Sequence, residues 1–93
     1  MTEKEVDELQ KKVQEKMDKL VPKFITHVEF LHIVKLNFQE TKYTRSLHVR
    51  LDGKGNYSHN EWNSDWVYKS VKLVKQLFSI FLPEDIDVYV YWE

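Results

Sequence analysis

The sequence contains no cysteine, and this absence excludes several kinds of site. Disulfide bonds, thiolate nucleophiles, cysteine-ligated zinc and iron–sulfur clusters all require a thiol. Small secreted domains often rely on disulfides for stability, so a chain of this size without any favours a cytoplasmic location.

Glycine and proline are also scarce, with two of each in 93 residues, which excludes collagen-like and low-complexity classes. With 42% hydrophobic residues, the chain has enough apolar surface to form a core. Its longest apolar stretch, 71–82, is interrupted by Lys72 and Lys75 and is too short to span a bilayer. We expect one soluble domain, 1–93, with no membrane partner.

No charge of one sign prevails, since 14 basic and 15 acidic residues give a net charge of −1. A chain this balanced has no global attraction for nucleic acid or anionic membranes. The distribution is uneven, because residues 23–59 carry a net charge of +3 and residues 60–93 a net charge of −3. Either the two oppositely charged segments neutralise each other within the domain, or they give it a bipolar surface.

Residues 3–21 show the periodicity of an amphipathic helix, with apolar residues mostly three or four apart. Thr2 and Glu5 predict a capping box at its start, and Pro22 predicts its end. The apolar stripe is narrow. It fits either packing on the chain's own sheet or a seam for a second copy, which leaves a homodimer open.

Residues 26–38 alternate with period two and predict a long strand. Its core face is expected to carry the even-numbered residues, Val28, Phe30, His32, Val34, Leu36 and Phe38.

Residues 43–51 predict the next strand, with 39–42 as the connecting loop. Tyr43 would begin its core face, followed by Leu47, Val49 and Leu51. A register that sets Val34 opposite Leu47 aligns the apolar faces. This register places Arg45 opposite Leu36, at the end of the sheet.

Residues 52–56 contain both glycines and predict a turn, after which 57–59 could form a short third strand. A second helix is expected from between 60 and 64 to 81, and a last strand over 86–92. The sequence thus predicts an α+β fold of two layers in the order α-β-β-(β)-α-β. Its sheet would be mostly antiparallel with three or four strands, and both helices would cover one face.

Residues 52–60 carry ligand-type side chains at alternating positions, as a calcium loop does. Such a loop needs glycine at its sixth position and glutamate at its twelfth, where Tyr57 and Asn63 stand. We therefore interpret this segment as a hairpin turn.

The other candidate sites are weaker still. The histidines lack the spacings of metal ligands on one strand face or one helix face. Ser46 and His48 share a strand face but lie in no nucleophile-elbow frame. The sequence predicts a protein that is not an enzyme and has no metal or cofactor.

The face opposite the expected core holds more apolar and aromatic residues than a solvated face needs. Tyrosine and tryptophan are common at the centres of protein interfaces. The residues expected to bind a protein partner are Leu31, Ile33, His48, Arg50, Tyr57, Trp62, Tyr89 and Tyr91. An alternative is single-stranded nucleic acid, held by Lys35, His48, Arg50 and the tyrosines.

A small, cysteine-free α+β chain of this composition resembles bacterial immunity proteins that neutralise toxins, and small phage-encoded inhibitors. The segment 46–57 is similar to a strand–turn–strand of some toxin-immunity families. That resemblance implies an inhibitor or antitoxin-type protein that occludes a partner protein. Nucleic-acid binding and a structural homodimer remain the alternatives.

Overall fold

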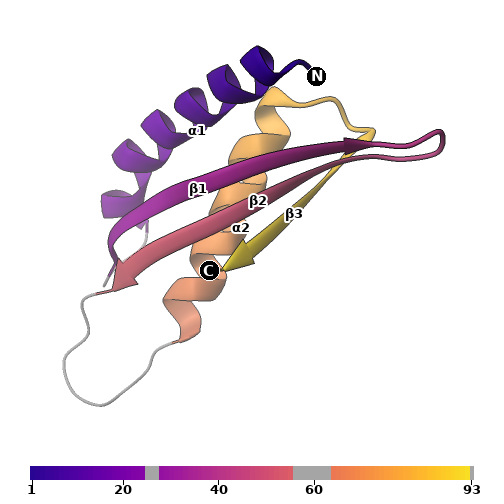
Figure 1. Cartoon of the computed structure of the whole chain (residues 1–93). Helices are drawn as coiled ribbons and strands as arrows, with labels where there is room; N and C mark the ends of the chain where they lie inside the picture. The colour runs from indigo at the N-terminus through magenta and orange to yellow at the C-terminus, as the bar shows by residue number, and fades with distance from the viewer. Residues whose placement is uncertain (25–27, 56–63, 93) are drawn as a thin grey trace.

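The computed structural model describes residues 1–24, 28–55 and 64–92, which form an α+β fold in the order α-β-β-α-β. The three strands lie side by side in the order β1-β2-β3 (Figure 1). β1 and β2 are antiparallel, whereas β2 and β3 are parallel, so the sheet is mixed rather than mostly antiparallel. The elements are α1 (Glu3–Phe24), β1 (Val28–Glu40), β2 (Arg45–Gly55), α2 (Ser64–Phe81) and β3 (Ile86–Trp92).

The predicted short strand at 57–59 lies outside the described residues. The second helix and the last strand are confirmed. β3 is parallel to β2 because α2 forms the crossover between them.

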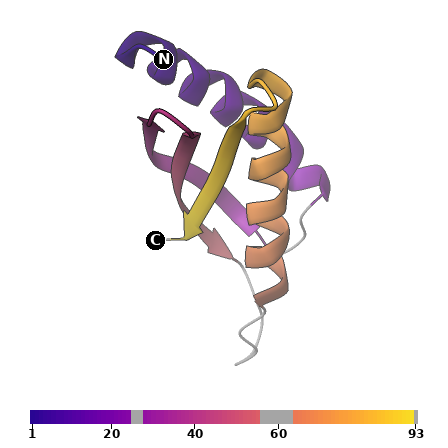
Figure 2. The ribbon, with the colours of Figure 1, turned by 90° about the vertical axis from the view of Figure 1, so that its right-hand side faces the viewer.

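The core lies between the sheet and the two helices. α1 contacts β1 and α2, while α2 contacts β3. Figure 2 shows α2 beside the sheet and α1 crossing above it. Every element contributes to one buried cluster, listed here by element: Leu9, Val13, Met17 and Val21; Leu31, Ile33 and Leu36; Leu47, Val49 and Leu51; Val74, Leu77 and Phe78; Ile86 and Val88.

The start of α1 is the predicted capping box. The Glu5 N–H donates to Thr2 Oγ1 at 3.2 Å, and the Thr2 N–H donates to Glu5 Oε1 at 3.4 Å. The predicted end at Pro22 is wrong, because α1 continues to Phe24. In the last turn a proline removes only one helical hydrogen bond, and Val21 stays helical with its side chain buried in the core.

Two glutamines of α1 bind the free edge of β1. Gln14 Nε2 donates to the Leu31 carbonyl at 2.9 Å, and the Ile33 N–H donates to Gln14 Oε1 at 2.9 Å. One turn earlier, Gln10 Nε2 donates to the Ile33 carbonyl at 3.0 Å. The Gln14 amide therefore pairs with the strand as another strand would, and it closes an edge that is otherwise open to association.

A β-bulge reverses the faces of β1. Ile33 pairs with Leu51 and Lys35 with Arg50, which leaves Val34 as an extra residue between them. The core face is therefore odd-numbered from Phe30 to the bulge and even-numbered after it. A second register shift, between Val28 and Phe30, leaves Val28 packed against the core as predicted. Leu31 and Ile33 are buried, so their predicted place on the opposite face is wrong.

The even-numbered residues from Phe30 to Val34 are displaced in the same way. Phe30, His32 and Val34 were expected in the core, yet all three are exposed. After the bulge, Leu36 and Phe38 lie on the core side as predicted.

The hairpin turn also lies further along the chain than expected. Thr41 and Thr44 close it, because the Thr41 N–H donates to the Thr44 carbonyl at 2.8 Å and the two Oγ1 atoms are 2.8 Å apart. Phe38 consequently faces Leu47, not Tyr43. Tyr43 stands in the turn with 86% of its surface exposed, so its predicted place in the core is wrong.

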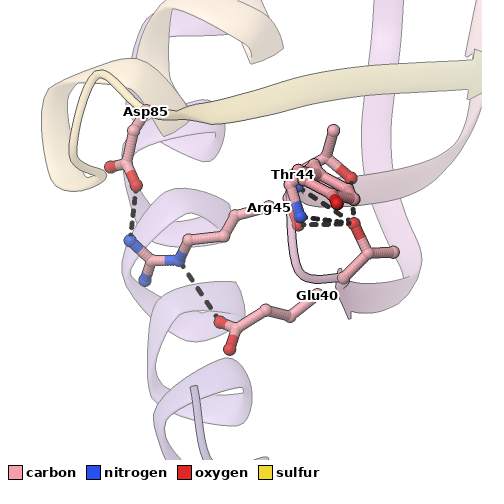
Figure 3. A network of polar contacts seen from close by, with 6 residues as sticks. Glu40, Thr44, Arg45 and Asp85 are labelled. Atoms are coloured by element: carbon pink, nitrogen blue, oxygen red, sulfur yellow. Dashed lines mark hydrogen bonds and ion pairs between the residues drawn. The ribbon is translucent and has the colours of Figure 1, made fainter.

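Arg45 pairs with Glu40, and its predicted place opposite Leu36 is wrong. Its guanidinium lies between two carboxylates, with Nη1 2.8 Å from Asp85 Oδ2 and Nε 3.3 Å from Glu40 Oε2 (Figure 3). The hydrogen bond to Asp85 raises the pKa of Arg45, more than desolvation lowers it. The contact ties the turn end of the hairpin to the start of β3.

Residues 52–55 continue β2, so the turn predicted at 52–56 is wrong over this part. Gly53 faces Leu31 in the sheet, and a Cβ there would lie 2.8 Å from Leu31 Cδ2 and 2.9 Å from the Phe30 carbonyl oxygen. This glycine therefore permits close packing in a strand and does not form a turn.

The bulge predicts that truncating Ile33 destabilises the fold more than truncating Val34, whereas strict alternation predicts the reverse order. Ile33→Ala should lower the free energy of unfolding by about 2–5 kcal/mol, because Ile33 is fully buried. Val34→Ala should lower it by less than about 1 kcal/mol, because Val34 is 39% exposed and lies outside the buried cluster. Urea denaturation of both variants measures the difference, and a larger loss for Val34→Ala would contradict the bulge.

The edge contact of Gln14 predicts a second effect on stability. Gln14→Ala leaves the Ile33 N–H and the Leu31 carbonyl without their partner and should cost about 1–3 kcal/mol. Gln76→Ala is the matched control, since Gln76 is exposed on α2. Equal denaturation midpoints for the two variants would mean that the edge contact contributes nothing.

Candidate functional site

The face of the sheet opposite the core carries side chains from all three strands, and we call it the open face. Cross-strand partners share a face, so the register assigns its members. Most of them are exposed. The open face consists of Phe30, His32, Lys35, Asn37 and Gln39 from β1, Ser46, His48, Arg50, Asp52 and Lys54 from β2, and Asp87, Tyr89 and Tyr91 from β3.

His48 lies at the centre of the open face and has contacts on several sides. Its Nε2 is 3.2 Å from Ser46 Oγ, and its Nδ1 is 3.0 Å from the Tyr91 hydroxyl. The imidazole also stacks with both tyrosines, with ring centroids 5.2 Å from Tyr89 and 5.7 Å from Tyr91. These contacts hold the partly buried imidazole and the two exposed tyrosine rings in one arrangement.

A hollow of about 250 Å³ lies beside this cluster on the open face. Its walls come from each strand of the sheet. We call it the donor hollow, because each of the described side chains that line it can donate hydrogen bonds. They are Lys35, Asn37, Gln39, His48, Arg50 and Tyr91.

The structure brings together four of the residues expected to bind a partner. His48 pairs with Tyr89, and Arg50 pairs with Tyr91. Tyr89 is 46% exposed and Tyr91 is 50% exposed, as a contact surface requires.

The other four expected residues do not join this surface. Leu31 and Ile33 have their side chains in the core, with 3% and 0% exposed. The bulge at Val34 causes this difference, since it reverses the faces of β1. Tyr57 and Trp62 lie outside the described residues.

Three residues of the open face were missed as site residues. Asn37 and Gln39 line the donor hollow, and Phe30 remains 49% exposed near the other end of β1. Alternation from Lys35 onward was the available signal for Asn37 and Gln39. Phe30 carried no such signal, because its face depends on the bulge.

The described residues contain neither a metal-binding cluster nor a helix that could span a membrane. Within the ranges 1–24, 28–55 and 64–92, no group of three or more His, Asp or Glu side chains could hold a metal ion. Over these same ranges, neither helix is long and apolar enough to cross a membrane.

The geometry around His48 makes a spectroscopic prediction. Tyr91→Phe removes the hydroxyl next to Nδ1, so the Nδ1 nitrogen shift should change by several parts per million. Tyr89→Phe is the matched control, because Tyr89 contacts the imidazole only by ring stacking. Long-range proton–nitrogen correlation spectra measure both shifts, and equal changes in the two variants would contradict the hydrogen bond.

Comparison with known proteins identifies no relative of this chain. No protein-family model matches the chain, and no curated protein or solved structure is significantly similar to it. Its function must therefore be argued from its own residues.

Proposed function

We propose that this chain is a non-enzymatic protein-binding domain of the cytoplasm, which acts by occluding a surface of its partner. This mode of action is that of an inhibitor or an immunity-type protein. The observation that carries the proposal is the pair of half-exposed tyrosines, Tyr89 and Tyr91, held in place by His48 on the open face.

Fixed aromatic rings are effective contact residues. Tyrosine and tryptophan predominate among residues whose truncation weakens protein complexes most. A side chain that is already ordered loses little rotamer entropy on binding, which otherwise costs about 0.5–1.5 kcal/mol per side chain. Tyr91 is ordered by both a hydrogen bond and ring stacking, so it is preorganised for contact.

The position of Ser46 supports a non-enzymatic role. Its Oγ lies near His48 Nε2, which could activate a nucleophile. Acyl transfer also needs N–H donors directed at the developing oxyanion. β2 is the central strand, and its N–H groups are engaged in the ladders to β1 and β3.

The nucleic-acid alternative is less well supported by the charges of the open face. Its lysines and arginines are Lys35, Arg50 and Lys54, and Asp52 and Asp87 lie on the same face. Three phosphate contacts give a salt slope of only about −2.1 to −2.7, well below the six to ten contacts of strong binders. His48 also stacks on the tyrosines, which competes with bases for their ring faces.

The homodimer alternative loses its original basis. It depended on the narrow apolar stripe of α1 as a seam between copies. Leu9, Val13, Met17 and Val21 of that stripe are buried in the chain's own core.

The test is affinity capture from lysate of the native host with nuclease present. Wild-type protein should retain a stoichiometric protein partner, and Tyr89→Ala with Tyr91→Ala should reduce its capture at least tenfold. The matched control is Tyr43→Ala with Tyr68→Ala, two exposed tyrosines away from the open face. This control should capture the partner as the wild type does.

Other outcomes discriminate between the alternatives. Capture that disappears with nuclease indicates nucleic acid. Capture lost equally in both double variants contradicts the open face as the contact surface. Light scattering on the same samples reports a homodimer, and circular dichroism confirms that each variant is folded.

A further inference from the structure

The free edge of β1 is closed by α1 over only part of its length. Gln10 and Gln14 bind the backbone of Leu31 and Ile33. The strand continues to Glu40, and Figure 1 shows its turn end extending beyond the start of α1. A strand edge without a covering element presents N–H and C=O groups that can pair with another chain.

The hydrogen bonds of the hairpin show which residues direct their backbone groups to this edge. The Thr41 N–H donates to the Thr44 carbonyl at 2.8 Å, so this pair bonds within the hairpin. Bonded and non-bonded pairs alternate in an antiparallel ladder, and the ladder has no register shift between the bulge and the turn. The N–H and C=O groups of Leu36, Phe38 and Glu40 therefore point away from β2. Within residues 1–24, 28–55 and 64–92, no hydrogen bond reaches these outward groups.

A groove of about 370 Å³ lies along this part of the edge, between the start of α1 and β1. We call it the edge groove. Its described lining combines apolar and charged side chains. Val6, Leu36 and Phe38 supply apolar surface, Glu3 and Asp7 supply carboxylates, and Lys35 supplies a cation.

The helix side of the edge groove is acidic. Glu3 and Asp7 line it, and both are exposed. Over residues 3–10, α1 carries four carboxylates and one lysine. Lys35 pairs with Arg50 in the sheet, and its side chain lies on the open face and not on the helix side. The charge of the helix side is therefore complementary to basic side chains.

We propose that the edge groove binds an extended segment of another protein, which adds to β1 as a further strand with basic side chains toward α1. Side chains alternate between the two faces of a strand, so every second residue of this segment points toward the helix. Lysine or arginine fits there, because its apolar stem can pack on Val6 and Phe38 while its charge reaches Glu3 or Asp7. The contact surface is the edge of β1 and not the open face, so it goes beyond the proposed function.

A second copy of this chain fits the edge less well than a basic segment does. Pairing β1 with its own copy would bring the acidic starts of two α1 helices to one shared groove. Like charges repel each other in that arrangement, whereas lysine or arginine side chains would be attracted.

The test is a hydrogen-exchange measurement by nuclear magnetic resonance on the nitrogen-15-labelled full chain. The probe is an acetylated and amidated hexapeptide of alternating threonine and lysine. At about nine-tenths saturation, the peptide should slow exchange of the Leu36, Phe38 and Glu40 N–H groups about tenfold, because they gain partners. The N–H groups of Asn37 and Gln39 point toward β2 and should change much less.

Two control peptides separate the contributions of backbone and charge. The same hexapeptide methylated at every backbone nitrogen keeps its side chains but cannot donate to the strand edge. A hexapeptide of alternating threonine and glutamate keeps the backbone but carries the opposite charge. Each should bind at least about tenfold more weakly than the threonine–lysine peptide.

Charge-neutral variants localise the binding to the edge groove. Glu3→Gln with Asp7→Asn should weaken binding of the threonine–lysine peptide about fivefold, because two exposed ion pairs are lost. Glu8→Gln with Glu15→Gln makes the same charge change at exposed positions of α1 outside the groove lining, and should leave binding within about twofold. Thermal melting checks that both double variants are folded.

Four results would overturn the inference. These are unchanged exchange with the threonine–lysine peptide, equal losses in the two double variants, protection of residues 88–91 of β3 in place of the β1 edge, or protection of the β1 edge without peptide in a dimer detected by light scattering. The last result would assign the edge to a second copy. Capture through Tyr89 and Tyr91 is measured separately, so failure at the edge leaves the proposed function standing.

Discussion

The contact between the Gln14 side chain and the edge of β1 determines how the layers meet. Its amide binds the backbone of Leu31 and Ile33, the two residues whose side chains enter the core just before the bulge. The helix is thereby anchored to the strand at the place where the strand's faces change. Because α1 occupies this edge and packs with α2, the described helices leave the other face of the sheet uncovered.

The helices and the last strand could be predicted because their signals are local. The capping box at Thr2 and the apolar spacing need no knowledge of the remaining chain. The faces of β1 were predicted wrongly over residues 30–34, because one extra residue, Val34, reverses the alternation there. Strict alternation places His32 on the core face, but the side chain is exposed. A histidine at an expected core position was the signal in the sequence that strict alternation fails there.

The candidate site was predictable where the strands carry no irregularity. β2 and β3 pair without a shift, so alternation alone assigned His48, Arg50 and both tyrosines of β3 to one face. The hairpin register was not predictable in the same way. It depends on hydrogen bonds between Thr41 and Thr44, and residue-type patterns did not distinguish this turn from one beginning two residues earlier.

The two arginines of β2 illustrate how the same residue type serves different purposes. Arg45 lies between Glu40 and Asp85, so the basic hairpin is joined to the acidic C-terminal third by an ion pair within the chain. Arg50 instead lies on the open face, between Lys35 of β1 and Tyr91 of β3. One arginine thus joins the hairpin to the start of β3, whereas the other places a cation beside the half-exposed tyrosines of the candidate contact surface.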